Sequence, residues 1–303
     1  MADLSVKIAG VTMKNPMIAA SGTVGFGQEY GALFPISTLG GISTKGTTLH
    51  RRPGNPPPRI AETPAGLLNS VGLQNPGADA FLAEELPRLK QEDLVVIANL
   101  AGSTLEEYVA VVEKVSDSDV DMIELNISCP NVKAGGAAFG VSAACAAEVT
   151  AAVRKVCKKP LIIKLSPNVS DIAEIARAVE AAGADAISLI NTLLGMRIDI
   201  RTRRPILRNN VGGLSGPAVF PVAVRMVWQA SRAVKIPVIG MGGISSAEDA
   251  VEMMLAGASA FQIGSALFAD PTCPVKILED LNRYLDEQGI ASVTELTGMV
   301  NPY

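Results

Sequence analysis

Short apolar runs recur along the chain, and each is followed by a polar or glycine-rich break and then usually by a segment with helical periodicity. The runs are continuously apolar rather than alternating, which is the pattern of parallel strands that are covered on both faces. Eight such strands are predicted, at residues 16–22, 40–46, 94–102, 122–128, 160–167, 186–192, 237–243 and 260–267.

The segments between the runs carry helix start and stop signals. Thr104 is followed three residues later by Glu107, and Ser245 by Glu248, which are capping-box patterns. The related phrases EAAGADAISLI and MLAGASAFQIG each close a helix with glycine, so one strand–helix unit recurs along the chain. Eight strand–helix alternations predict an α/β fold, a closed (β/α)8 TIM barrel that residues 1–303 form as a single domain. A doubly wound open sheet is the alternative.

Composition favours a protein that binds neither nucleic acid nor membrane. Of the 303 residues, 48% are hydrophobic and 4% aromatic, so small and aliphatic side chains must fill the core. The net charge is −4, and we interpret the densest basic cluster, RTRRP at 201–205, as a local loop feature. The sequence has no signal-peptide layout and no run of about 18 apolar residues. Its four cysteines form no C-x-x-C pair, which indicates free thiols, a cytoplasmic protein and no metal or iron–sulfur site.

Polar side chains and glycine turns stand where the predicted strands end. In a barrel the carboxyl ends of all strands meet at one mouth, where such enzymes keep their active sites. We therefore expect one group of residues to lie together at that mouth: Ser21, Lys45, Asn99, Asn126, Lys164, Asn191, Gly242, Gly243, Gly264 and Ser265.

The glycine turns after the last two strands, GMGGI at 240–244 and GSAL at 264–267, predict a phosphate site. Backbone N–H groups can approach an anion closely there, because no side chain intervenes. Lys45 and Lys164 end otherwise apolar strands and need an anion or a polarised carbonyl as partner. The reduced pyrimidine ring of a flavin meets that need, and so does a Schiff base in an aldolase.

The asparagines favour the flavin. Asn69, Asn99, Asn126, Asn131 and Asn191 offer paired amide donors and acceptors. An amide matches an imide or urea edge with two hydrogen bonds and carries no charge that must be neutralised. This set of amide side chains suits recognition of a pyrimidine or a flavin ring and suits a metal-dependent reaction poorly.

Cys129 is predicted to be the general base, in the stretch LNISCPN at the end of the fourth strand. A thiol with a free pKa of about 8.5 can take a carbon-bound proton at mildly alkaline pH. The residue lies on a glycine-containing active-site loop, about 128–140, that could close over a ligand. We interpret Cys145 and Cys157 as helical core residues, and the one histidine, His50, as an exposed loop residue rather than the base.

Taken jointly, the motifs resemble those of the dihydroorotate dehydrogenases, flavin enzymes of pyrimidine synthesis. They are SGTVGFG (21–27), STKGTT (43–48), NSVGLQNPG (69–77), ELNISCPN (124–131), INTLLGMRID (190–199), GGLSGPA (212–218) and GMGGI (240–244), spread over nearly the whole chain. The cysteine of SCPN is similar to that of the soluble class, since the membrane-associated class carries serine there and an additional N-terminal helical segment. NTLLGMRIDIRTRRPIL followed by NNVGGLSGPA resembles the NAD-linked type, which works with a second subunit that holds FAD and a [2Fe–2S] cluster.

The resemblance also implies a set of site residues. FMN would be bound by Ser21, Lys45, Gly46, Asn99, Asn126, Lys164, Ile190, Gly216, Gly242, Gly243, Gly264 and Ser265. The substrate would be bound by Lys45, Asn69, Ser70, Val71, Gly72, Leu73, Asn126, Asn191 and Thr192. Cys129 and Lys164 would be catalytic, and an insertion of about residues 193–216 is expected after the sixth strand.

The expected reaction is the oxidation of (S)-dihydroorotate to orotate, in which Cys129 takes the proton from C5 and hydride leaves C6 for FMN. Because the sequence has neither a nicotinamide fingerprint nor a cluster motif, electrons would reach NAD through the FAD/[2Fe–2S] subunit, in a heterotetramer of two catalytic and two partner chains. The alternatives are a fumarate-using soluble dihydroorotate dehydrogenase, a dihydropyrimidine dehydrogenase-type subunit, and a flavin-free aldolase or phosphate-binding module on the same barrel.

Overall fold

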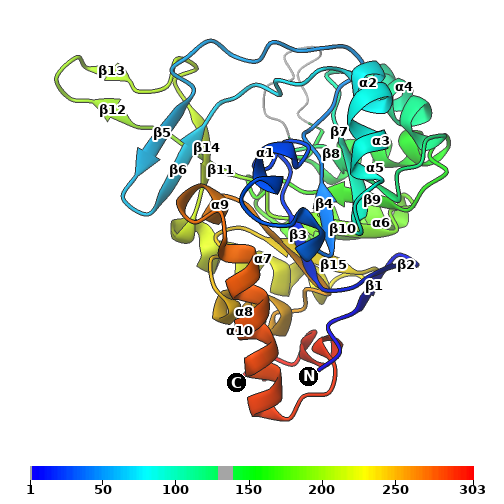
Figure 1. The fold of residues 1–303 in the computed structure, drawn as a ribbon. Helices are drawn as coiled ribbons and strands as arrows, with labels where there is room; N and C mark the ends of the chain where they lie inside the picture. Colours follow the sequence, from blue (N-terminus) through cyan, green and yellow to red (C-terminus); the bar gives the residue numbers. More distant parts are fainter. Residues whose placement is uncertain (1, 129–138) are drawn as a thin grey trace.

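A closed barrel of eight parallel strands forms the centre of the computed structural model, which describes residues 2–128 and 139–303 (Figure 1). The strands are β3 (Met17–Ala19), β4 (Gly41–Ser43), β7 (Val95–Leu100), β8 (Met122–Asn126), β9 (Leu161–Lys164), β10 (Ala186–Leu189), β15 (Val238–Met241) and β16 (Ala260–Ile263). Neighbours in the barrel follow chain order, and β16 closes the ring on β3. The predicted TIM barrel is confirmed, and the doubly wound open sheet is wrong.

Each observed strand begins at the first or second residue of a predicted run and ends before that run does. Every residue of β7 and of β15 is buried, because side chains fill the barrel and helices cover its outside. Some of the polar residues at the ends of the runs belong to the strands, as Asn126 and Lys164 do at the ends of β8 and β9, and others follow them. Ser21 and Lys45, for example, come two residues after the ends of β3 and β4.

Helices surround the barrel and alternate with its strands. The long ones are α4 (Leu105–Ser116), α5 (Ala143–Arg154), α6 (Ile172–Ala181), α7 (Phe220–Ser231), α8 (Ala247–Leu255) and α10 (Cys273–Gln288). The short ones are α1 (Gln28–Gly31), α2 (Ala78–Ala80), α3 (Leu86–Leu89) and α9 (Ala266–Ala269), with 3-10 turns at Ile36–Thr38, Pro217–Val219 and Val293–Leu296 and a π turn at Phe81–Glu85. Gly183 and Gly257 follow the ends of α6 and α8 with φ of +101° and +120°, a conformation that favours glycine.

The predicted helix starts are right for α4 and displaced by one residue for α8. Thr104 is the N-cap of α4, and its hydroxyl accepts the N–H of Glu107 at 3.2 Å. The cap of α8 is Ser246 rather than Ser245, and Asp249 closes its capping box. Consecutive serines make both registers plausible in sequence, and Asp249 decides between them because its carboxylate accepts the N–H groups of both serines.

A second, four-stranded sheet stands outside the barrel and was not predicted. It has the order β11 (Leu193–Gly195), β14 (Gly212–Ser215), β6 (Gly66–Asn69), β5 (Ile60–Thr63), and all its pairs are antiparallel. The hairpin β12 (Ile198–Asp199) and β13 (Arg204–Pro205) projects from it, and β1 (Val6–Ile8) with β2 (Val11–Met13) forms a separate N-terminal hairpin (Figure 1). The sheet thus joins the segment before residue 70 to the segment after residue 192.

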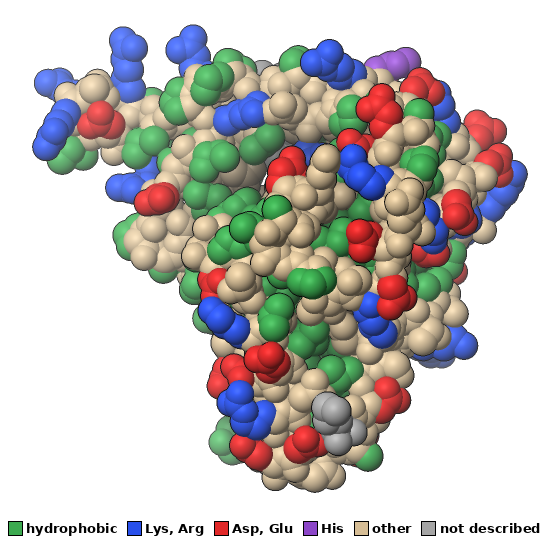
Figure 2. Space-filling view, viewed as in Figure 1, with side chains coloured by type: hydrophobic (Ala, Val, Ile, Leu, Met, Phe, Trp, Pro, Cys, Tyr) green, Lys and Arg blue, Asp and Glu red, His purple; other side chains and the backbone are tan. Residues whose placement is uncertain are grey.

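The basic cluster RTRRP lies in the turn and second strand of the projecting hairpin. Lys and Arg side chains gather at that projection, at the upper left of Figure 2. Arg201, Arg203 and Arg204 are exposed there, as expected of a local loop feature. Within the described ranges, no helix is both long and apolar enough to cross a membrane.

Candidate active site

Asn126, Lys164 and Asn191 meet at the carboxyl ends of three neighbouring strands. Asn126 and Lys164 are the last residues of β8 and β9 and face each other in register. Asn126 Oδ1 accepts hydrogen bonds from Ser128 Oγ at 2.6 Å and from Asn191 Nδ2 at 3.4 Å. Asn191 also donates to Ser128 Oγ, so the two asparagines and the serine form one connected group.

A second group surrounds Gly46, just beyond the end of β4. A Cβ at Gly46 would lie 3.0 Å from Asn99 Oδ1, 3.3 Å from Leu73 Cδ2 and 3.9 Å from Ser21 Oγ. Asn99 has no exposed surface, and its Oδ1 has no hydrogen-bond partner among the described residues. A buried acceptor without a partner is costly, and it indicates a ligand that donates a hydrogen bond there.

The glycine turns form a third group. A Cβ at Gly242 would lie 3.0 Å from Ile190 Cγ1, and a Cβ at Gly243 would lie 2.8 Å from the carbonyl oxygen of Gly216. Both turn glycines have positive φ, +123° and +82°, so these positions need glycine for conformation as well as for space. Gly264 follows β16 and lies beside the end of β3, since its Cβ would be 3.6 Å from Ala20 Cβ. The structure therefore brings the predicted phosphate-binding turns to the same end of the barrel.

The segment 69–73 reaches the mouth through the outer sheet. Asn69 pairs with Gly213 of β14, and a Cβ at Gly213 would collide with Thr192, so both substrate candidates flank one glycine. Asn55 was not predicted, yet its Nδ2 donates to the carbonyl oxygen of Ser70 at 2.8 Å and fixes this segment. Ser70 is buried, and its Oγ has no partner in the described part of the chain.

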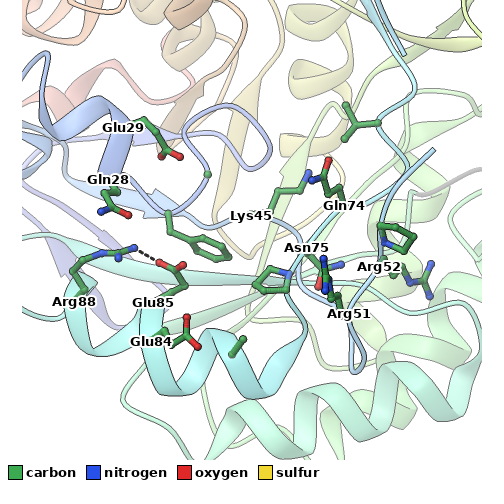
Figure 3. Close-up of a pocket in the computed structure, with 16 residues that line it drawn as sticks. Gln28, Glu29, Lys45, Arg51, Arg52, Gln74, Asn75, Glu84, Glu85 and Arg88 are labelled. Carbon is green, nitrogen blue, oxygen red and sulfur yellow. Dashed lines mark hydrogen bonds and ion pairs between the residues drawn. The ribbon is translucent and has the colours of Figure 1, made fainter. Parts of the chain in front are cut away.

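Lys45 lines a cavity of about 830 Å³ (Figure 3). Its side chain extends toward Gln74, and Arg51, Arg52 and Asn75 lie nearby. Among the described residues predicted for the site, Lys45 and Val71 are the two that line this cavity. The cavity thus adjoins the substrate segment rather than the glycine turns.

Glu124 is a buried charged residue that the sequence analysis missed. It lies within β8, has no exposed surface, and its carboxylate is 3.8 Å from Lys164 Nζ. Burial would raise the pKa of this carboxyl, but the charge of Lys164 and hydrogen bonds from hydroxyl and amide donors outweigh burial and leave the pKa below its ordinary value. The signal was visible in MIELNIS, where an acid interrupts an apolar run.

Cys129 and Asn131 lie outside the described residues. The residues that flank the undescribed segment 129–138 lie close to the end of β8. A Cβ at Gly140 would be 2.6 Å from the carbonyl oxygen of Ile127, and Phe139 packs edge-on against Tyr108 with ring centroids 5.6 Å apart. Tyr108, a core residue of α4, donates to the carbonyl oxygen of Asn126 at 2.8 Å. The predicted active-site loop therefore leaves and rejoins the described chain beside the asparagine group.

The three other cysteines are free thiols. The prediction of two helical core residues holds in part: Cys157 is buried but lies beyond the end of α5, and Cys145 lies in α5 but is only half-buried. Burial raises the pKa of the Cys157 thiol, and burial together with the nearby Asp270 raises that of Cys273 to about 11. Such thiols stay protonated at neutral pH and are poor bases. His50 is exposed in a loop, as predicted.

Comparison with known proteins gives matches over nearly the whole chain. The family model for dihydroorotate dehydrogenase matches residues 3–285. The chain is 58% identical to the "Dihydroorotate dehydrogenase B (NAD(+)), catalytic subunit" of Bacteroides thetaiotaomicron, over 98% of this chain and 99% of that protein. Proteins with the same description from Parabacteroides distasonis and Alkaliphilus oremlandii are 57% and 54% identical, over 99% and 98% of this chain and equal shares of their own.

Proposed function

The chain belongs to the dihydroorotate dehydrogenase family, and on that premise we propose that it is the catalytic subunit of an NAD-linked enzyme that oxidises (S)-dihydroorotate to orotate in pyrimidine biosynthesis. One observation of the site carries the proposal. Uncharged amides from Asn99, Asn126 and Asn191 converge beside the buried ammonium of Lys164 at the mouth of the barrel. That arrangement recognises a pyrimidine edge and favours negative charge beside it.

The residues at the mouth fit FMN. The buried Oδ1 of Asn99 can accept a hydrogen bond from an N–H group of the ligand. The glycine turns at 242–243 and 264 have no side chains that would keep a phosphate from their backbone N–H groups. When bound, FMN supplies the acceptor for the hydride of the substrate. Lys164 supplies positive charge for the reduced ring, and the remaining FMN-binding residues that we propose are Ser21, Lys45, Gly46, Asn126, Ile190, Gly216 and Ser265.

We assign substrate binding to residues at the barrel mouth and at the edge of the outer sheet. Asn69, Asn126, Asn191 and Thr192 would hold the pyrimidine edge and carboxylate with amide and hydroxyl groups. The remaining candidates, Lys45, Ser70, Val71, Gly72 and Leu73, belong to the cavity rim and to the segment that Asn55 anchors. Cys129 would take the proton from C5, since it directly follows Ser128, which is bonded to both Asn126 and Asn191.

A partner subunit would connect this site to NAD. The relatives are described as catalytic subunits, which implies a second chain. We propose that the partner carries FAD and a [2Fe–2S] cluster and that two copies of each chain assemble. The three described cysteines are free thiols, which supports the proposed cytoplasmic location.

An anaerobic titration with dihydroorotate, followed in the flavin absorption band, tests the function. We expect the purified chain to be yellow and to bleach stoichiometrically. A yellow protein that bleaches with dihydrouracil instead would identify a dihydropyrimidine dehydrogenase-type subunit. A protein that neither contains FMN nor takes it up would contradict the proposal and favour the flavin-free aldolase.

The isolated chain is expected to reduce artificial acceptors and not NAD, because we assign the NAD route to the partner. Dihydroorotate-dependent formation of NADH, measured with and without the partner subunit, checks this. Addition of the partner should restore it. Robust NADH formation by the chain alone would contradict the partner proposal, and turnover with fumarate would identify the partner-free enzyme type.

Substitution of a turn glycine is expected to separate FMN binding from folding. In Gly264→Ala, the new Cβ meets its nearest neighbours at 3.6 Å, so the variant should fold normally while its methyl group obstructs the phosphate. We expect FMN affinity to fall on the order of tenfold, equivalent to about 1.4 kcal/mol. Gly243→Ala is the matched comparison, since its φ of +82° and a contact of 2.8 Å should lower the stability of the FMN-free protein as well. Wild-type FMN affinity in Gly264→Ala would exclude this turn as the phosphate site.

A further inference from the structure

Glu124 lies at the centre of the barrel and collects hydrogen bonds from four other strands. Its Oε2 accepts from Ser43 Oγ of β4 and from Asn99 Nδ2 of β7, both at 2.6 Å. Its Oε1 accepts from Ser188 Oγ of β10 at 2.7 Å and from Gln262 Nε2 of β16 at 2.8 Å. Each oxygen therefore accepts two hydrogen bonds. Only an ionised carboxylate can accept all four, because a protonated one would place its own O–H against one of these donors.

The carboxylate determines which atom Asn99 presents to the mouth. An ionised carboxylate can only accept, so the amide nitrogen of Asn99 must face Glu124. The amide oxygen is then directed to the other side, where it lies next to Gly46 without a partner among the described residues. Asn99 thus offers an acceptor, and not a donor, to whatever binds there.

The same carboxylate is the counterion of Lys164. Lys164 is buried, and its Nζ lies 3.8 Å from Glu124 Oε2, the oxygen that also holds Asn99. A buried ammonium without an anion is strongly disfavoured. Glu124 therefore gives the Lys164 side chain a buried anionic partner at the end of β9, independently of any ligand.

We propose that Glu124 is a positioning residue for the flavin site: its carboxylate orients the Asn99 amide toward the ligand and, as the buried partner of Lys164, fixes the position of that side chain at the end of β9. This inference rests on the proposed function, since FMN is the ligand in question. Glu124 itself would not touch substrate or FMN, because all of its acceptor positions are used inside the barrel.

The test is a double-mutant cycle of Glu124→Gln with Asn99→Ala, read out as the dissociation constant of FMN for correctly folded protein. The NH2 group of the new glutamine would face side chains that themselves donate hydrogen bonds, so Asn99 loses its fixed orientation. FMN affinity should then fall at least tenfold. In the Asn99→Ala background the same substitution should cost clearly less, because its main target is already gone. The proposal would be overturned if the losses of FMN binding free energy in the two single variants simply added in the double variant. Wild-type FMN affinity in Glu124→Gln would overturn it as well.

A second readout does not depend on FMN. The folded-state pKa of Glu124 is lowered, so its contribution to stability is present above the ordinary value near 4.5 and is lost as pH falls through the lower folded-state value. We expect the Tm of FMN-free Glu124→Gln at pH 7 to fall by about 5 to 10 °C, and the difference to shrink below pH 4.5. If the wild-type chain binds no FMN while this shift appears, the proposed function has failed and the network remains.

Glu124→Asp is a second variant that keeps the test possible if Glu124→Gln does not fold. It keeps the charge but is shorter by one methylene, so it cannot reach all four donors, and FMN affinity should fall non-additively with Asn99→Ala. Ser188→Ala is the matched control, because it removes a donor from Oε1 and leaves the oxygen that holds Asn99; its FMN affinity should stay within about threefold. If neither Glu124 variant folds even with FMN present, Glu124 is required for the barrel itself and the positioning role is overturned.

Discussion

Replacement of Cys129 by alanine is expected to abolish turnover of dihydroorotate while leaving FMN bound. A general base contributes about 10²- to 10⁴-fold to the rate, and the described neighbours of Cys129 offer no substitute. Ser128 and Asn126 are bonded to each other and to Asn191, and His50 lies in an exposed loop. Rapid-mixing measurement of flavin reduction under anaerobic conditions checks the rate, and the absorption spectrum checks FMN content.

The matched control is Cys157→Ala. Cys157 lies before the amino end of β9, opposite the mouth, and burial raises its pKa, so its loss should leave the rate unchanged. Cys129→Ser should retain some activity. This activity should increase with pH, because the serine hydroxyl is a weaker acid than the thiol and its ionised fraction grows as the pH rises. Near-normal turnover in Cys129→Ala would remove this residue from the mechanism without affecting the flavin assignment.

The barrel was predictable because its signal is local. Strands covered on both faces must be apolar throughout, and β7 and β15 are buried at every position. The polar residues toward the end of each predicted run are equally local, and closure of the ring then brings Ser21, Asn99 and Lys164 to one end without further information.

The outer sheet was not predictable because its pairing is non-local. β6 and β14 are four residues each and pair across more than 140 positions, with Asn69 opposite Gly213. Short strands of glycine and leucine carry little periodicity, so the sequence of neither segment indicates which strand it pairs with. Glu124 was missed for a related reason, since its role depends on donors from four strands whose register only the closed barrel fixes.

The two structural layers correspond to two halves of the proposed site. Most FMN candidates, such as Asn99, Lys164 and Gly264, lie at or just beyond the carboxyl ends of barrel strands. Asn69 and Thr192 instead lie on or beside the outer sheet, where they flank Gly213. Substitutions in that sheet are therefore expected to alter substrate affinity before they alter FMN binding.

Lys164→Met is expected to reduce the rate of flavin reduction by about 10²- to 10³-fold and also to destabilise the FMN-free protein. The rate falls because the only buried ammonium in the described barrel is lost, and with it the charge that favours the reduced ring. The stability falls because Glu124 would remain buried without its counterion, at a cost of about 3 to 5 kcal/mol. Rapid mixing with dihydroorotate and denaturant unfolding at pH 7 measure the two effects separately.

The pH dependence and a surface control distinguish this pair from an ordinary ion pair. Without Lys164, burial dominates and the pKa of Glu124 should rise, so the stability deficit of Lys164→Met should shrink as acid protonates the carboxyl. Lys158→Met breaks an exposed pair with Asp117 at the other end of β9 and should change stability by less than about 1 kcal/mol and the rate not at all. A Lys164→Met protein as stable as Lys158→Met would mean that the hydroxyl and amide donors alone hold Glu124 ionised, so that Lys164 serves the flavin and not the barrel.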